Sequence, residues 1–172
     1  MRVLRFAGAF APNIWMLGGQ GATIAAGQNG ASLCLDSFYE MHSHTTIREM
    51  GMRYSELFRS RIASRKPEFA VAVAGICGPT ETEAVEALKS AGSTGFPVGI
   101  MKRMFAGSPS MWEEYLNEAA EKWATNKFVV LVASHDLAVR RRSLELLGET
   151  LGLGDRQYSE SLNPRVDCAS AT

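Results

Sequence analysis

The run FAVAVAG at residues 69–75 constrains the fold of this chain more than any other feature. A strand without alternating polar residues is buried on both faces, as in sheets that helices cover on each side. A second apolar run, KFVVLVAS, spans residues 127–134. Apolar residues at helical spacing follow each run, so the second half of the chain predicts alternating strands and helices.

Capping residues predict where several helices begin. A Ser or Thr followed three residues later by Glu forms a capping box, and this pattern occurs at Thr46–Glu49, Thr80–Glu83 and Ser110–Glu113. Asp136 is a good N-cap for a last helix over residues 137–150, whose inward side chains are expected to be Leu137, Leu144 and Leu147. The segment FPVGIM at 96–101 is expected to form a further strand.

The first forty residues follow a different pattern. Short β-like runs at 2–6 and 13–17 precede two apolar segments around Asn29-Gly30, a hairpin signal because both residues tolerate positive φ. We therefore expect an antiparallel meander, and a fold class of α/β with a three-layer mixed sheet. The segment LGGQG at 17–21 lacks a following helix in this interpretation, so no phosphate cradle is expected there. Neither GxGxxG nor a P-loop motif occurs.

Composition adds further limits. The 172 residues suit a single domain, expected over 1–154, with a polar and poorly ordered tail over 155–172. Lys and Arg total 18, as do Asp and Glu, so no global basic field favours nucleic acid. Three cysteines without a CxxC pair fit free thiols in the cytoplasm better than a secreted disulfide framework. No run reaches the roughly 18 apolar residues of a membrane span, so no membrane partner is expected.

Cys77 lies at a predicted strand–helix corner and is one candidate for chemistry. A thiol at a helix N-terminus can have a lowered pKa, and GICGPT at 75–80 resembles the nucleophile corner of the DJ-1 and class I amidotransferase families. His135 could act as its base, since parallel strands end at the same edge of a sheet. Equally, Cys77 can be a small buried hydrophobic residue. A third alternative is a non-catalytic ligand-binding or oligomeric module with its pocket at that edge.

Other polar groups are candidates for metal or nucleic-acid binding. Glu40, His42 and His44 lie close together before a helix, but spacing marks no further ligand, and a solvated loop also explains them. Basic residues gather in three places, where they could neutralise phosphate or form a solvated face: residues 58–66, Lys102 with Arg103, and Arg140 with Arg141.

Several strings resemble the RuvC-type Holliday-junction resolvases of the RNase H-like nuclease superfamily. VLRFAGAFAPNIWML at 3–17 is similar to that family's first strands, and FRSRIASRKPEFAVAVAG at 58–75 to its segment before a catalytic glutamate. STGFPVGIMKRMFAGS at 93–108 is similar to its G-x-P-V strand with a basic pair, and SHDLAV at 134–139 to its last helix. The resemblance implies an RNase H-like fold, branched or duplex DNA as the partner, a homodimer and Mg²⁺-dependent endonuclease chemistry.

The departures from that family fall on its catalytic positions. Ala7 and Ala74 stand where the family carries acids, and Val139 stands at the second of its final acids. Asp136 alone has a counterpart, as catalytic residue and metal ligand. One carboxylate cannot hold two Mg²⁺ ions, so nuclease activity is expected to be reduced, absent or removed by substitution, and the sequence leaves open whether the alanines are natural. The expected DNA contacts are Lys102, Arg103, Arg140 and Arg141.

Overall fold

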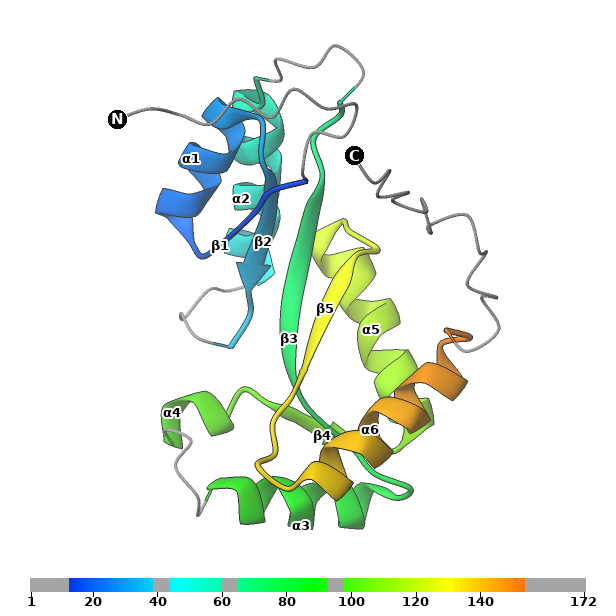
Figure 1. The fold of residues 1–172 in the computed structure, drawn as a ribbon. Coiled ribbons are helices and arrows are strands. Elements are labelled where there is room, and N and C mark those ends of the chain that lie inside the picture. The colour runs from blue at the N-terminus through cyan, green and yellow to red at the C-terminus, as the bar shows by residue number, and fades with distance from the viewer. Residues whose placement is uncertain (1–12, 39–43, 60–64, 93–97, 154–172) are drawn as a thin grey trace, which may run out of the picture.

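The structure is a computed structural model that describes residues 13–38, 44–59, 65–92 and 98–153. Strands and helices alternate along most of these ranges (Figure 1). Their order is β1 (Trp15–Leu17), α1 (Gln20–Asn29), β2 (Ser32–Asp36), α2 (His44–Leu57), β3 (Phe69–Cys77), α3 (Glu81–Gly92), α4 (Val98–Met101), β4 (Phe105–Gly107), α5 (Pro109–Trp123), β5 (Phe128–Val132) and α6 (Leu137–Thr150).

Every strand pair in the described ranges is parallel. The long strand β3 is the centre of the sheet, because it pairs with β2, β4 and β5, while β1 pairs with β2. Ala72 accepts from the N–H of Ser37 after β2, and the N–H of Gly78 donates to Gly107 of β4. Even-numbered residues of a strand point their backbone groups to one edge, so β2 and β4 share an edge of β3 and β5 occupies the other.

The expected antiparallel meander is wrong, and with it the RNase H-like mixed sheet; the α/β class is confirmed. Residues 20–29 form helix α1 instead of a strand, so β1, α1 and β2 make a parallel crossover unit. Gly30 adopts φ 64° and ends α1 as its left-handed C-cap. An Asn-Gly pair supplies positive φ to a helix end as readily as to a hairpin turn, and this caused the error.

Two apolar layers cover the two faces of the sheet. Odd-numbered residues of β2 and β3, including Leu33, Leu35, Val71 and Val73, pack with side chains from helices on one face. Those helices form a continuous row, since α1 contacts α2, α2 contacts α5 and α5 contacts α6 (Figure 1). The opposite face carries Cys34 and three alanines, at 70, 72 and 74, with Met104 and parts of α3 and α4 packed on it. The alternating small side chains therefore all point to one side.

Several predicted helix boundaries are confirmed. Thr80 Oγ1 accepts a hydrogen bond from the N–H of Glu83 (3.3 Å) and donates one to the Glu83 carboxylate (2.9 Å). These two residues are the pair predicted to cap α3. Asp136 accepts from the N–H groups of Ala138 (2.7 Å) and Val139 (3.4 Å), so it is the predicted N-cap of α6. These local signals were reliable because the capping residue and its partner lie within one turn of each other.

Other local predictions are wrong. Residues 98–101 form helix α4 rather than a strand, and the short strand lies later, at 105–107. Helix α5 begins at Pro109 with Ser108 as its N-cap, because proline is favoured in the first helical turn. On α6, Leu147 is buried as expected, but Leu137 and Leu144 are exposed. The predicted strand at 2–6 and tail at 155–172 lie outside the described residues, and the single-domain prediction stays a prediction. Across the described ranges, no helix is long and apolar enough to cross a membrane.

Candidate functional site

The carboxyl edge of the parallel sheet is the expected place for a ligand, because strand ends and helix N-termini meet there in open α/β sheets. Five corners reach this edge in the described part of the chain. They contain Gly18 and Gly19 after β1, Asp36 and Ser37 at the end of β2, Cys77 and Gly78 at the end of β3, Ser108 after β4, and residues 134–136 after β5.

The corner between β1 and α1 depends on glycine. Gly18 has φ +146°, a conformation that side chains with a Cβ rarely adopt, and a Cβ built on it would lie 3.2 Å from Ala22 Cβ. Its N–H donates to the carbonyl oxygen of Cys34 (3.1 Å), which ties the corner to the adjacent strand β2. The chain therefore turns sharply from β1 into the first turn of α1.

The N-terminus of α1 is suited to an anion. The N–H of Thr23 donates to Gly19 O (3.0 Å), so the N–H groups of the three preceding residues have no acceptor within the helix. Gly19 makes no side-chain cap, and the first turn carries no acidic residue. A Cβ at Gly21 would meet no atom within 4 Å, so this turn faces open space. Such N–H groups, with the positive end of the helix dipole, bind phosphate in many proteins.

The end of β2 is held by hydrogen bonds and aromatic packing. Ser37 donates to Ala72 O from both its N–H and its hydroxyl (3.0 Å each). Burial raises the pKa of the Tyr115 phenol, and a hydrogen bond with Ser37 partly offsets that rise. The Tyr115 ring stacks on Phe105, with centroids 4.5 Å apart, and meets Trp112 edge-on. These contacts join β2, β4 and α5 close to the candidate edge.

Both described thiols lie near this edge, and neither is set up as a thiolate. Burial raises the pKa of Cys77 to about 11, against a smaller lowering by Arg142. Burial, followed by the charge of Asp36, raises the pKa of Cys34. The backbone N–H of Cys77 donates to the buried Ser143 Oγ (2.8 Å), which fixes the end of β3 against α6. Since the thiolate is the nucleophilic form, these surroundings oppose a catalytic role for Cys77.

The remaining predicted catalytic and metal residues lie on different elements or outside the described residues. Asp136 caps α6, and Ala74 is buried inside β3 beside Leu131 of β5. Ala7 and His42 lie outside the described residues, and only the backbone of His44, the first residue of α2, is described. Within the described ranges, no group of three or more His, Cys, Asp or Glu side chains could hold a metal ion. The roles predicted for His135 and for the Asp136, Ala7 and Ala74 set are untested as site assignments.

The predicted DNA contacts also occupy separate elements. Lys102 and Arg103 form the turn after α4, whereas Arg140 and Arg141 lie on α6. Arg141 Nε donates to Glu145 Oε1 (2.8 Å), and Arg142 approaches the other oxygen of that carboxylate (3.6 Å). Part of the predicted basic cluster on α6 is therefore neutralised within its own helix.

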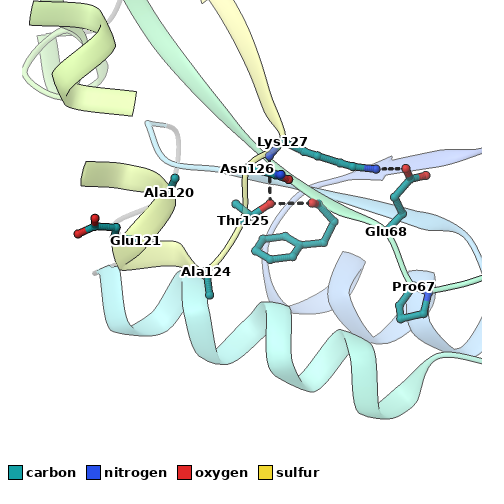
Figure 2. Close-up of a pocket in the computed structure, with 9 residues that line it drawn as sticks. Pro67, Glu68, Ala120, Glu121, Ala124, Thr125, Asn126 and Lys127 are labelled. Atoms are coloured by element: carbon teal, nitrogen blue, oxygen red, sulfur yellow. Dashed lines mark hydrogen bonds and ion pairs between the residues drawn. The ribbon is translucent and has the colours of Figure 1, made fainter. Parts of the chain in front are cut away.

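A cavity lies at the opposite, amino end of the sheet (Figure 2). It has a volume of about 560 Å³ and is open to solvent. Lys127 forms an ion pair with Glu68, which lowers the pKa of that carboxyl, and Thr125 donates to Phe69 O (3.0 Å). Figure 2 shows these bonds joining the starts of β3 and β5. The cavity's polar groups thus hold two strands together, and we assign it a structural role.

Comparisons with known proteins identify the fold. No protein-family model matches the sequence, and no protein of curated function does. The structure is similar to apo-MsnO8, with a TM-score of 0.64 and 22% identity over 87% of this chain and 53% of that chain. It is also similar to the FMN complex of the oxygenating constituent of 3,6-diketocamphane monooxygenase from Pseudomonas putida, a type II Baeyer-Villiger monooxygenase. The TM-score is 0.60 and the identity 19%, over 81% of this chain and 48% of that chain. A third similar structure is the coenzyme F420-dependent tetrahydromethanopterin reductase from Methanopyrus kandleri. Its TM-score is 0.53 and its identity 14%, over 79% of this chain and 49% of that chain.

The chain has the fold of these luciferase-like oxidoreductases. It spans about half the length of each of the three solved structures. The RuvC-type resemblance is therefore wrong, as are the DNA-binding nuclease function and the Mg²⁺ cofactor that it implied. The similar segments are short apolar strands and basic turns, which many α/β proteins share. The two folds differ in the directions of their strands, and short sequence segments do not reveal strand direction.

The signal that sequence reasoning missed is LGGQG at residues 17–21. The sequence predicts no helix after this segment and therefore no phosphate cradle, whereas the structure places α1 directly behind it. Gly18, Gly19 and Gly21 at the end of an apolar strand were the available evidence. A strand–glycine–helix corner of this kind is a common anion site in parallel sheets.

Proposed function

We propose that this chain is the phosphate-binding part of a flavin-dependent oxidoreductase, and that the flavin phosphate binds at the N-terminus of α1. The observation that carries this proposal is the glycine corner Gly18-Gly19, which directs first-turn N–H groups that have no acceptor within α1 toward the carboxyl edge of the sheet. The likeness to an FMN complex and to an F420-dependent enzyme supplies the class of cofactor, since both are similar to this chain in fold.

The surroundings of α1 fit a phosphate group. No carboxylate lies in the first turn to repel it, and no side chain at Gly21 would fill the space where it would bind. The bond from Gly18 N–H to β2 holds the corner, so little reorganisation is needed on binding. A bound flavin would supply the electron-transfer and oxygen chemistry, and this chain's backbone would orient it through its phosphate.

The neighbouring corner at the end of β2 gives this site a buried side with polar groups. Asp36 is 7% exposed at the end of β2, and Tyr115 reaches Ser37 from α5. Neither thiol is activated, so we propose no covalent catalysis by this chain and assign it cofactor binding and orientation.

Substitutions at Gly21 test the proposal. Gly21→Asp places a carboxylate beside the proposed phosphate site, whereas Gly21→Asn has the same shape without the charge. Both should fold, because the position is open and an acidic residue in a first helical turn is stabilising. Two unit charges about 6 Å apart at an effective dielectric of about 20 repel by roughly 3 kcal/mol, so FMN should bind roughly 10- to 100-fold more weakly to the aspartate variant.

Flavin fluorescence titration measures this effect, with riboflavin as the ligand that lacks the phosphate. We expect the wild type to prefer FMN over riboflavin, the aspartate variant to lose that preference, and the asparagine variant to keep it. Equal binding of FMN and riboflavin by the wild type would refute the phosphate site. An unchanged FMN affinity in the aspartate variant would refute its placement at α1.

A further inference from the structure

Asp36 is a buried carboxylate at the carboxyl edge of the sheet. It is the last residue of β2, whose sequence SLCLD is buried throughout and carries no other charged side chain. Burying a carboxylate costs free energy unless hydrogen bonds replace the water that it loses. An acid at this position therefore indicates a hydrogen-bonding role at the strand end, which packing of the strand by itself does not require.

Asp36 lies beside the glycine corner that precedes α1. Strands β1 and β2 are adjacent and parallel, with Leu17 opposite Cys34 (Figure 1). The N–H of Gly18 donates to the carbonyl oxygen of Cys34 (3.1 Å), so the pairing continues from β1 into the corner. Asp36 comes two residues after Cys34, and neighbouring strands of a sheet lie about 4.8 Å apart. The carboxylate and the first turn of α1 therefore belong to adjacent strand ends of one edge.

The side chain of Asp36 belongs to the face of the sheet opposite the helix row. Alternate residues of a strand point the same way, so Asp36 shares the side of Cys34, which packs with the alanines of β3. The charge of Asp36 accordingly raises the pKa of the Cys34 thiol, after the larger effect of burial. Helix α1 packs on the other face. A ligand held by its phosphate at α1 would meet Asp36 where it crosses the sheet edge.

A carboxylate at this place is suited to the hydroxyl groups of a ligand. It accepts hydrogen bonds at about four sites, so it can accept from a ligand in addition to its contacts in the protein. In dinucleotide-binding sheets an acid at the end of the second strand accepts from ribose hydroxyls, while the phosphate binds at the first helix. A flavin nucleotide has the corresponding order of groups, since its ribityl hydroxyls lie next to its phosphate.

We propose that the carboxylate of Asp36 accepts hydrogen bonds from the ribityl hydroxyl groups of the flavin. This inference rests on the proposed function and adds recognition of a polyhydroxyl chain to the phosphate site. Asp36 and the phosphate are both negatively charged, so the carboxylate favours the hydroxyl chain and opposes the phosphate. The two effects have opposite signs, and ligands that differ by one group at a time separate them.

Three flavins form the required series. FMN has the ribityl chain and the phosphate, riboflavin has the chain alone, and lumiflavin has neither. The ratio of riboflavin to lumiflavin affinity, the chain ratio, reports on the hydroxyl groups, and fluorescence titration measures it. Asp36→Asn keeps the shape of the side chain and removes its charge, so it should lower the chain ratio about 10-fold. The preference for FMN over riboflavin should stay equal or rise, because a nearby negative charge is lost.

Asp136→Asn is the matched control. Asp136 caps α6 at another corner of the same edge, and asparagine caps a helix as well as aspartate does. This variant loses the same unit of charge and should keep the chain ratio of the wild type. Circular dichroism reports whether each variant is folded. The wild type gives a reading that needs no variant, since it should bind riboflavin at least about 10-fold more tightly than lumiflavin.

Several outcomes would overturn the inference. Equal binding of riboflavin and lumiflavin by the wild type is one, and a folded Asp36→Asn variant with an unchanged chain ratio is another. An equal fall of the chain ratio in Asp136→Asn would assign the effect to the charge of the whole edge. Absence of binding by all three flavins would refute the proposed function and this inference with it. Equal binding of FMN and riboflavin would refute only the phosphate site, because the chain ratio still reports on Asp36.

Discussion

Tyr54 tests how much a buried hydroxyl that bonds two backbone groups contributes to stability. Its side chain on α2 is fully buried. The hydroxyl donates to Ala31 O (2.8 Å) and accepts from the N–H of Glu68 (3.0 Å), so one group satisfies the backbone just before β2 and just before β3. Tyr54→Phe removes this hydroxyl and keeps the ring, including its edge-on contact with Phe58 at 5.7 Å.

The expected loss follows from the two backbone groups left behind. Each buried donor or acceptor without a partner costs about 1–3 kcal/mol, and relief from burying the hydroxyl offsets part of that cost. We expect Tyr54→Phe to reduce the free energy of unfolding by about 2–4 kcal/mol. In a protein of this size 1 kcal/mol corresponds to about 2–4 °C, so Tm should fall by roughly 5–15 °C.

Urea denaturation and thermal scans at one fixed protein concentration measure this loss, since assembly would otherwise shift the apparent stability. Tyr115→Phe is the control: it deletes the same atom, and Ser37 keeps its bond to Ala72 O, so the loss should stay near 1 kcal/mol. If the two variants lose equal stability, the reasoning from unpaired backbone groups is refuted.

Two further changes have definite outcomes. Gly75→Ala should lower the free energy of unfolding by more than about 3 kcal/mol in a denaturant titration, because its Cβ would lie 1.9 Å from Phe105 O and 2.8 Å from the Trp112 ring; wild-type stability would contradict this close approach. Because the folded pKa of Cys77 is raised to about 11 from 9.0, its contribution to stability is complete below pH 9 and is lost as the pH rises toward 11. Cys77→Ala should therefore flatten the decline in stability over that range, and an equally steep decline would contradict the raised pKa.

The elements that sequence reasoning placed well are those with strong local signals. The runs that became β3 and β5 are apolar and flanked by polar residues, and Thr80 and Asp136 contact N–H groups two or three residues away. Strand direction has no such local signal. Whether β1 and β2 run parallel depends on the structure between them, so one misassigned helix turned a parallel sheet into a mixed sheet in the prediction.

Helix α1 was missed because it has no apolar stripe. Its packing depends on small residues: a Cβ at Gly27 would lie 2.8 Å from Leu57 Cβ and 3.2 Å from Tyr54 O of α2. A helix that approaches its neighbour so closely buries Ala26 and Gly27 instead of large side chains, and its sequence shows no helical period. The candidate site was lost with it, because the corner at Gly18 becomes an anion site only when a helix follows.

Strand β3 determines how the sheet can come apart. It pairs with three strands, whereas β1, β4 and β5 each touch one partner in the described ranges. Each outer strand can separate from the sheet by itself. An opening that releases residues 71–75 of β3, in contrast, breaks its pairing with β2, β4 and β5 at the same time. Amide protons of these residues should therefore exchange with solvent only through global unfolding, and the amides of β1 should exchange first.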